Sequence, residues 1–313
     1  MSVNLLKMFA CVLAVAACTQ SEPPTEAIEA GKGLPEVYTV NYPLAYFAER
    51  IAGESVTVVF PAPPNVDPAF WSPDAETIAD YQQADLVLLN GAGYAGWLQR
   101  ATLSQSRLID TSGAMTDQLI ALDDTVTHSH GPGGDNSHQG MAFTSWLDME
   151  FAAGQARTVF DSLVRLRPEN ESDYRERLYE LEKDLGELDT RLKVVAERIG
   201  DQPLVFSHPV FQYLARAYEL NGRSVHWEPD ETPGDDQWRE LFELLSAHNA
   251  AWMIWEDEPL PDTVSRLEGM GIESLVFRPC GNRPAEGSLV SVMLDNVMAL
   301  ETAFPASAHQ HWQ

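Results

Sequence analysis

A tract of three closely spaced histidines is the part of this chain whose residue types most directly suggest chemistry. His128, His130 and His138 lie within eleven residues of a chain that has eight histidines in all. Glycine, proline, serine and asparagine surround them, so the composition predicts a loop over residues 127–140. Neutral imidazole is a common zinc and copper ligand, and a flexible His-x-His pair can adapt its geometry to an ion. The tract is therefore a candidate metal-collecting loop, although an ordinary polar surface loop could have the same composition.

The remaining candidates follow from the elements that must position them. Short apolar or β-branched runs alternate with amphipathic helical patterns through residues 35–167 and again through residues 201–313. The predicted strands are residues 37–40, 56–60, 85–89, 107–109, 204–206, 224–227, 252–255 and 274–277. The alternation predicts an α/β fold of two lobes, each with a mostly parallel sheet flanked by helices.

Ligands of open parallel sheets bind beyond the carboxyl ends of the strands, so the residues after each predicted strand are candidates for a binding site. In the first lobe they are Asn41, Asp67, Phe70, Trp71, Asn90, Tyr94, Asp110 and Thr111. In the second lobe they are Ser207, His208, Glu228, Asp230, Glu231, Glu256, Asp257, Glu258 and Arg278. The first set is rich in aromatic and amide groups and the second is acidic, so a cleft between the lobes could hold a cation.

One long helix is predicted over residues 168–200, between the two lobes. Its apolar residues recur at steps of three and four, and Gly200 ends it. They are Leu178, Leu181, Leu185, Leu188, Leu192 and Val195. A coiled-coil dimer would have the same stripe. We favour a helix laid against both lobes, which permits only small hinge motions.

The N-terminal sequence predicts export. Lys7 precedes a short apolar run, and Val-Ala-Ala-Cys at residues 15–18 resembles a bacterial lipobox. This pattern predicts a signal peptide over residues 1–17, a lipidated Cys18 and a solvated tether over residues 18–34, with plain cleavage nearby as the alternative. The folded part is then expected on the periplasmic side, held to the membrane by its lipid.

Charge and cysteine content narrow the classes of partner and fold. The chain has 47 acidic and 20 basic residues, a formal net charge of -27 that repels nucleic acid and anionic headgroups. Solubility alone could also explain such a charge. Without Cys11 and Cys18, only Cys280 is left in the mature chain, so no internal disulfide is expected.

Over nearly all of residues 35–303 the chain resembles the solute-binding receptors of zinc and manganese ABC importers. These receptors have two lobes joined by a backbone helix. The resemblance lies in the order and spacing of several motifs. They are Asn41-Tyr42-Pro43, Asn65-Val66-Asp67-Pro68, Trp71-Ser72-Pro73, residues 84–91 (ADLVLLNG), Trp146-Leu147-Asp148, Ser207-His208, residues 213–216 (YLAR), and Met293 with Asn296. The histidine tract lies where zinc-binding members have a similar loop.

The resemblance also implies four metal ligands, and three of the corresponding positions differ here. A histidine after Asp-Pro corresponds to Ala69, a second histidine to Thr144, and the carboxylate before a proline to Arg278. Only the third ligand, His208, is present. Tetrahedral zinc needs three or four donors, and a guanidinium beside one imidazole would repel the ion.

Three interpretations remain open. In the first, a rebuilt metal site uses His208, Glu228 and Glu256, with Arg278 turned away to pair with a carboxylate. In the second, Arg278 holds a non-metal or chelated anion while Trp71 or Phe70 stacks on it. The third is an exported hydrolase, for which we identify no activated nucleophile.

The first interpretation is our prediction. We expect a non-enzymatic, lipid-anchored receptor that delivers zinc, with Mn²⁺ or another transition metal as the alternative cargo, to an ABC permease in the inner membrane. His128, His130 and His138 would form an accessory metal-collecting loop.

Overall fold

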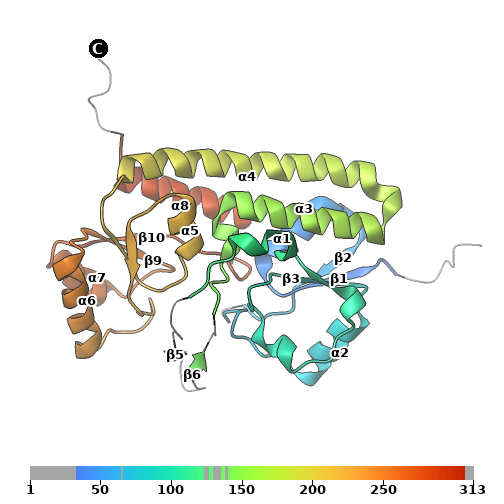
Figure 1. Ribbon diagram of the computed structural model, residues 1–313, viewed down its shortest axis with the longest axis horizontal. Helices are drawn as coiled ribbons and strands as arrows, with labels where there is room; N and C mark the ends of the chain where they lie inside the picture. Colours follow the sequence, from blue (N-terminus) through green and yellow to red (C-terminus); the bar gives the residue numbers. More distant parts are fainter. Residues whose placement is uncertain (1–32, 65, 123–126, 130–134, 138–139, 307–313) are drawn as a thin grey trace, which may run out of the picture. The chain divides into compact units, whose positions relative to one another are not determined.

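Two four-stranded parallel sheets form the framework of the protein (Figure 1). The structure is a computed structural model that describes residues 33–64, 66–122, 127–129, 135–137 and 140–306. The first sheet has the order β2-β1-β3-β4. Its strands are β1 (Glu36–Thr39), β2 (Thr57–Val59), β3 (Leu86–Leu89) and β4 (Leu108–Asp110), with helices α1 (Tyr42–Ala52) and α2 (Ala75–Gln83) between them.

The second sheet repeats this arrangement with the order β10-β9-β7-β8. Its strands are β7 (Leu204–Phe206), β8 (Gly222–Ser224), β9 (Trp252–Trp255) and β10 (Glu273–Val276). The helices of this half are α5 (Gln212–Ala217), α6 (Asp235–Ala247), α7 (Pro261–Glu268) and α8 (Leu289–Ala303). All pairings within both sheets are parallel, which confirms the predicted fold class.

The helix α4 (Glu171–Ile199) connects the two sheets and confirms the predicted long helix. It packs along α1, α8 and α3 (Met149–Leu166), and Figure 1 shows it running beside α3 and α8. The leucine stripe is buried in this packing, so the chain itself covers the face that a coiled-coil partner would need. No helix in the described ranges is long and apolar enough to cross a membrane.

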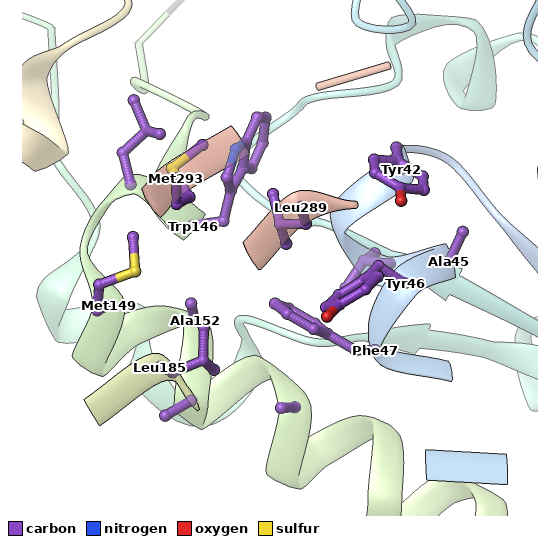
Figure 2. Packing of buried hydrophobic residues seen from close by; sticks show 14 of the residues in the cluster. Tyr42, Ala45, Tyr46, Phe47, Trp146, Met149, Ala152, Leu185, Leu289 and Met293 are labelled. Atoms are coloured by element: carbon purple, nitrogen blue, oxygen red, sulfur yellow. The ribbon is translucent and has the colours of Figure 1, made fainter. Parts of the chain in front are cut away.

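The core beneath α4 draws on elements far apart in sequence. Figure 2 shows Tyr46 and Phe47 of α1, Leu185 of α4 and Leu289 of α8 packed together. The same buried cluster includes Leu88 of β3 and Phe206 of β7, one strand from each sheet, along with Leu275 of β10. One continuous core therefore supports both sheets.

Strand β8 differs from its prediction. It ends at Ser224, whereas the apolar pattern predicted a strand over residues 224–227. Val225 and Trp227 are fully buried, and their amides donate to Phe206 O (2.9 Å) and Ser207 O (2.7 Å). The extended segment therefore continues beside β7 past the end of β8, which explains its strand-like sequence.

The histidine tract also differs from the predicted loop. Its backbone contains a short antiparallel pair, β5 (Thr127–Ser129) with β6 (Asp135–Ser137), in which His128 is opposite Asn136. Backbone hydrogen bonds make this pairing without any apolar alternation, so the sequence pattern could not indicate it. His130 and His138 lie outside the described residues.

Candidate functional site

A cavity of about 530 Å³ lies beyond the carboxyl ends of strands from both sheets. The first half contributes mostly apolar and aromatic residues, including Val66, Phe70, Tyr94, Phe143 and Trp146. The second half contributes polar and acidic residues, including His208, Glu228, Asp230, Glu256, Asp257 and Glu258. The expected aromatic and acidic residues thus lie on opposite sides of the cavity, whereas the amides Asn41 and Asn90 expected in the first half are not part of the lining that the described residues form.

His208 lies between two carboxylates at the acidic end of the cavity. It follows β7, the strand that pairs with β8 on one side and β9 on the other. Glu228 follows β8 and Glu256 directly follows β9, so three neighbouring chain segments place these side chains together. The ring is buried, with Nε2 at 3.6 Å from Glu228 Oε1 and Nδ1 at 3.8 Å from Glu256 Oε1.

The two carboxylates face different nitrogens of one ring, and this limits what the three side chains can do together. A single ion takes one imidazole nitrogen, so it would share His208 with only one of the two glutamates in this arrangement. The other glutamate would accept the ring N–H and fix the ring orientation, as outer-shell carboxylates do at metal sites. In the described part of the chain, no group of three His, Cys, Asp or Glu side chains is arranged to hold an ion.

The pKa of Glu256 is raised to about 8, chiefly by burial and further by the negative charges of Glu228, Asp67 and Asp257. Its carboxyl group is therefore mostly protonated at neutral pH. A cation bound beside it would oppose both causes and favour loss of the proton. The acidic end of the cavity is thus suited to exchanging a proton for a metal ion.

Asp67 is a further possible donor that the set His208, Glu228 and Glu256 leaves out. It lines the cavity from the first half, and its Oδ1 accepts the Ala69 amide at 2.8 Å. The sequence places it after β2 and two residues before Ala69, where the resemblance implies a ligand. This position, close to an expected ligand, was the feature of the sequence that could have identified Asp67 as a donor.

At two of the three altered ligand positions, Ala69 and Thr144, the side chains pack in the protein interior. Ala69 and Thr144 are buried, and the Thr144 hydroxyl donates to the carbonyl oxygen of Val210. Ala69 has no donor atom, and the hydroxyl of Thr144 is oriented toward a backbone carbonyl, so neither position supplies the imidazole that the resemblance implies. The structure therefore agrees with the sequence, in which Ala69 and Thr144 stand where the resemblance implies histidine ligands.

The guanidinium of Arg278 is paired with two carboxylates that follow β9, Asp257 and, at 3.7 Å, Glu258. Arg278 Nε donates to Asp257 Oδ1 at 2.9 Å, and the Arg278 backbone N–H donates to Asn296 Oδ1 at 2.9 Å. The side chain is 49% exposed. As far as the described residues define it, the cavity lining includes neither Arg278 nor the half-buried Trp71.

Several amides expected at strand ends form a structural network instead. Asn41 Nδ2 donates to Asn90 Oδ1 at 3.0 Å, and Gln155 Nε2 donates to Thr111 Oγ1 at 3.0 Å. All four side chains are buried, and Asn41 also caps α1. These residues link β1, β3 and β4 to α3 and do not line the cavity described here.

Comparison with known proteins gives a consistent family. The family described as "Zinc-uptake complex component A periplasmic", ZnuA, matches residues 37–303. The high-affinity zinc uptake system protein ZnuA of Bacillus subtilis is 25% identical over 278 residues, 87% of each chain. The zinc-binding lipoprotein AdcA of Streptococcus pneumoniae is 23% identical over 96% of this chain, which spans 60% of AdcA. The manganese ABC transporter substrate-binding lipoprotein PsaA of Streptococcus pneumoniae is 24% identical over 77% of this chain and 79% of PsaA.

Solved structures show the same fold. The Zn(II)-bound ZnuA-like domain of Streptococcus pneumoniae AdcA matches with a TM-score of 0.73 at 21% identity, covering 88% of this chain and 100% of that domain. The metal-dependent lipoprotein YcdH of Bacillus subtilis has a TM-score of 0.71 at 21% identity, covering 86% and 98%. With two parallel sheets, a connecting helix and a family match through residues 37–303, the chain belongs to the ZnuA family of periplasmic zinc-uptake components.

Proposed function

We propose that this protein captures a divalent transition-metal ion, zinc before manganese, at the acidic end of its cavity. Membership of the ZnuA family makes the chain a metal solute-binding component of an ABC importer and not an enzyme. The observation that carries the proposed site is the position of His208 between Glu228 and Glu256. Imidazole nitrogen and carboxylate oxygen are both zinc donors.

Within this site, His208 Nε2 and Glu228 would bind the ion from the second half of the chain. Glu256 would accept the Nδ1 proton of the same ring, and Asp67 would approach from the first half when the ion binds, because no three such side chains of the described residues are already arranged around one point. Arg278 would stay paired with Asp257, which keeps its positive charge occupied. A set of one imidazole and two carboxylates is a known zinc-binding class and also suits the oxygen preference of manganese.

Export, anchoring and delivery complete the proposal. The Val-Ala-Ala-Cys ending supports lipidation of Cys18, and relatives such as AdcA and PsaA are themselves described as lipoproteins. The family implies a partner permease in the inner membrane. His128, His130 and His138 would act as an accessory collector of metal for the cavity.

Calorimetric zinc titration tests the site once the loop histidines are removed. In a chain with His128, His130 and His138 replaced by alanine, we expect zinc binding to remain. Adding Glu228→Gln should then lower the affinity by more than about 100-fold, and Glu256→Gln by about 10- to 100-fold, as expected for an outer-shell partner.

The matched control is Glu231→Gln, which makes the same charge change outside the cavity lining and should leave the affinity unchanged. Loss of all binding in the triple histidine variant would reject the cavity as a metal site. If Glu228→Gln and Glu231→Gln lowered the zinc affinity equally, the loss of affinity would result from the change in net charge and not from a lost ligand.

The anion-binding interpretation makes the opposite predictions. It requires Arg278 to face the ligand, but the guanidinium is paired with Asp257 at 2.9 Å. If His208→Ala left zinc affinity unchanged while Arg278→Ala abolished citrate binding, the proposed metal site would be wrong. We expect instead that His208→Ala lowers the zinc affinity and that no citrate binding depends on Arg278.

A further inference from the structure

The cavity offers much more space than a metal ion fills and few donors around any one point. Its volume of about 530 Å³ lies in the range of about 300–1,000 Å³ typical of sites for small organic molecules. His208 faces Glu228 with one nitrogen and Glu256 with the other, so each ring edge presents one imidazole nitrogen and one carboxylate. Other ligands would have to complete the coordination of an ion held there.

The wall from the first half of the chain is built for an organic surface. Phe143 makes edge-to-face contacts with Tyr94, at 5.3 Å between ring centroids, and with Phe70 at 6.3 Å. Trp146 packs against Tyr94 at 5.8 Å. A rigid aromatic wall with a few polar groups is the usual lining of a small-molecule pocket and contributes nothing to a bare ion.

Tyr94 also brings a buried hydroxyl to this wall. The residue is 2% exposed, and its hydroxyl has no hydrogen-bond partner among the described residues. A Cβ at position 281, also in the lining, would lie 3.5 Å from the hydroxyl. Burial and the charge of Asp67 raise the pKa of Tyr94 well above 10, so the group stays protonated as a donor. A buried donor without an acceptor lowers stability, and an acceptor on a ligand would remove that cost.

Hydrogen bonds join the two halves of the chain beside the cavity. Trp146 Nε1 donates to Pro279 O at 2.7 Å, and Asn282 Nδ2 donates to Val66 O at 2.7 Å and Pro63 O at 2.8 Å. These bonds already join the segment after β10 to the first half of the chain.

We propose that the cargo enters as a complex of the metal with a small organic chelator, neutral or positive in overall charge. This inference rests on the proposed metal-binding function and adds the class of ligand. The metal would lie beside His208 and Glu228, and the chelator would supply the missing donors. Its body would lie against Phe143, and one of its oxygens would accept the Tyr94 hydroxyl. The carboxylate of Asp230 at the acidic end would disfavour an anionic complex, whereas that of Glu258 is paired with Arg278.

Equilibrium dialysis with radiolabelled L-histidine tests this proposal in the full chain carrying the His128, His130 and His138 alanine substitutions. L-Histidine is a suitable probe because its zinc complexes are neutral or cationic and its ring is planar. We expect the protein to retain zinc and labelled histidine together, and to retain little histidine without zinc. Nitrilotriacetate, whose zinc complex is anionic, should not be retained.

Three results would overturn the proposal in distinguishable ways. Zinc retained without histidine would reject the chelate while leaving the metal site intact. Histidine retained without zinc would show an organic-ligand site and reject the chelate as cargo. Retention of neither would reject the proposed metal-binding function as well.

A variant pair tests the role of the hydroxyl. Tyr94→Phe removes only the donor and should lower the affinity for the zinc–histidine complex by about five- to tenfold, the effect of one hydrogen bond. Tyr179→Phe makes the same change at a side chain exposed outside the cavity and should have no effect. Equal affinities of the Tyr94 and Tyr179 variants would contradict the predicted contact.

Discussion

The position of His208 between two carboxylates depends on two kinds of information, and only one is present in the sequence. Strand order predicts that residues following β7, β8 and β9 meet at one edge of the sheet, so Glu228 and Glu256 could be chosen as partners. The pairing of each carboxylate with a different ring nitrogen depends on side-chain torsions set by packing. For the same reason, the sequence offered the pairing of Arg278 with a carboxylate only as one of several possibilities and did not identify Asp257 as the partner.

The raised pKa of Glu256 predicts a pH dependence of stability in the metal-free protein. The folded-state pKa of about 8 exceeds the ordinary value of 4.5, so the folded protein binds more protons than the unfolded chain between these values. Stability should therefore fall as pH rises from about 4.5 to 8, then level off. Glu256→Gln should flatten this fall, measured as melting temperature between pH 5 and 9 with a chelator present.

Glu286→Gln is the matched control for that experiment, because Glu286 is exposed outside the cavity lining. This variant should retain the pH dependence of the wild-type protein. Parallel curves for wild type and Glu256→Gln would contradict the assigned titration.

At the scale of elements, α4 was predicted from the sequence as one long helix, whereas α3 was not predicted. The buried face of α4 is a regular series of leucines, which gives a clear helical period. The buried face of α3 includes Ala152, Ala153 and Ala156, and Gly154 interrupts the helix interior. Small residues allow close packing, since a Cβ at position 154 would lie 2.3 Å from Met115 Sδ. The same face also has large apolar residues such as Phe151, Val159 and Leu163, so a helical period was present in the sequence although α3 was not predicted from it.

Shortening a leucine of the buried stripe on α4 should lower the free energy of unfolding. Leu185 is 2% exposed within the core shared with α1 and α8, so Leu185→Ala should destabilise the protein by about 2–5 kcal/mol through lost burial and a cavity. Urea denaturation measures this change in the free energy of unfolding. Tyr179→Ala on the same helix, at a side chain that is 65% exposed, should have an effect below about 0.5 kcal/mol. Similar losses in the two variants would mean that the stripe is not part of the core.

At the scale of the whole molecule, charge repulsion should make stability depend on salt. The chain has 47 acidic and 20 basic residues, so like charges outnumber their partners over much of the surface. Screening should relieve this repulsion, and we expect the melting temperature to rise between about 0.01 and 0.5 M sodium chloride. Glycerol at equal osmolality is the control for general solute effects. A melting temperature that falls with salt would show that attractive ion pairs outweigh the repulsion.

The continuous core beneath α4 determines how cooperatively the protein should unfold. Leu88 and Phe206 belong to different sheets but to one buried cluster, and α8 follows the second sheet yet packs on α1 of the first half. Neither half can thus separate from the other without exposing apolar surface. We expect calorimetry to record a single cooperative transition whose calorimetric and van't Hoff enthalpies agree. Two resolved transitions would contradict this expectation, whereas a single transition would mean that the two halves unfold together.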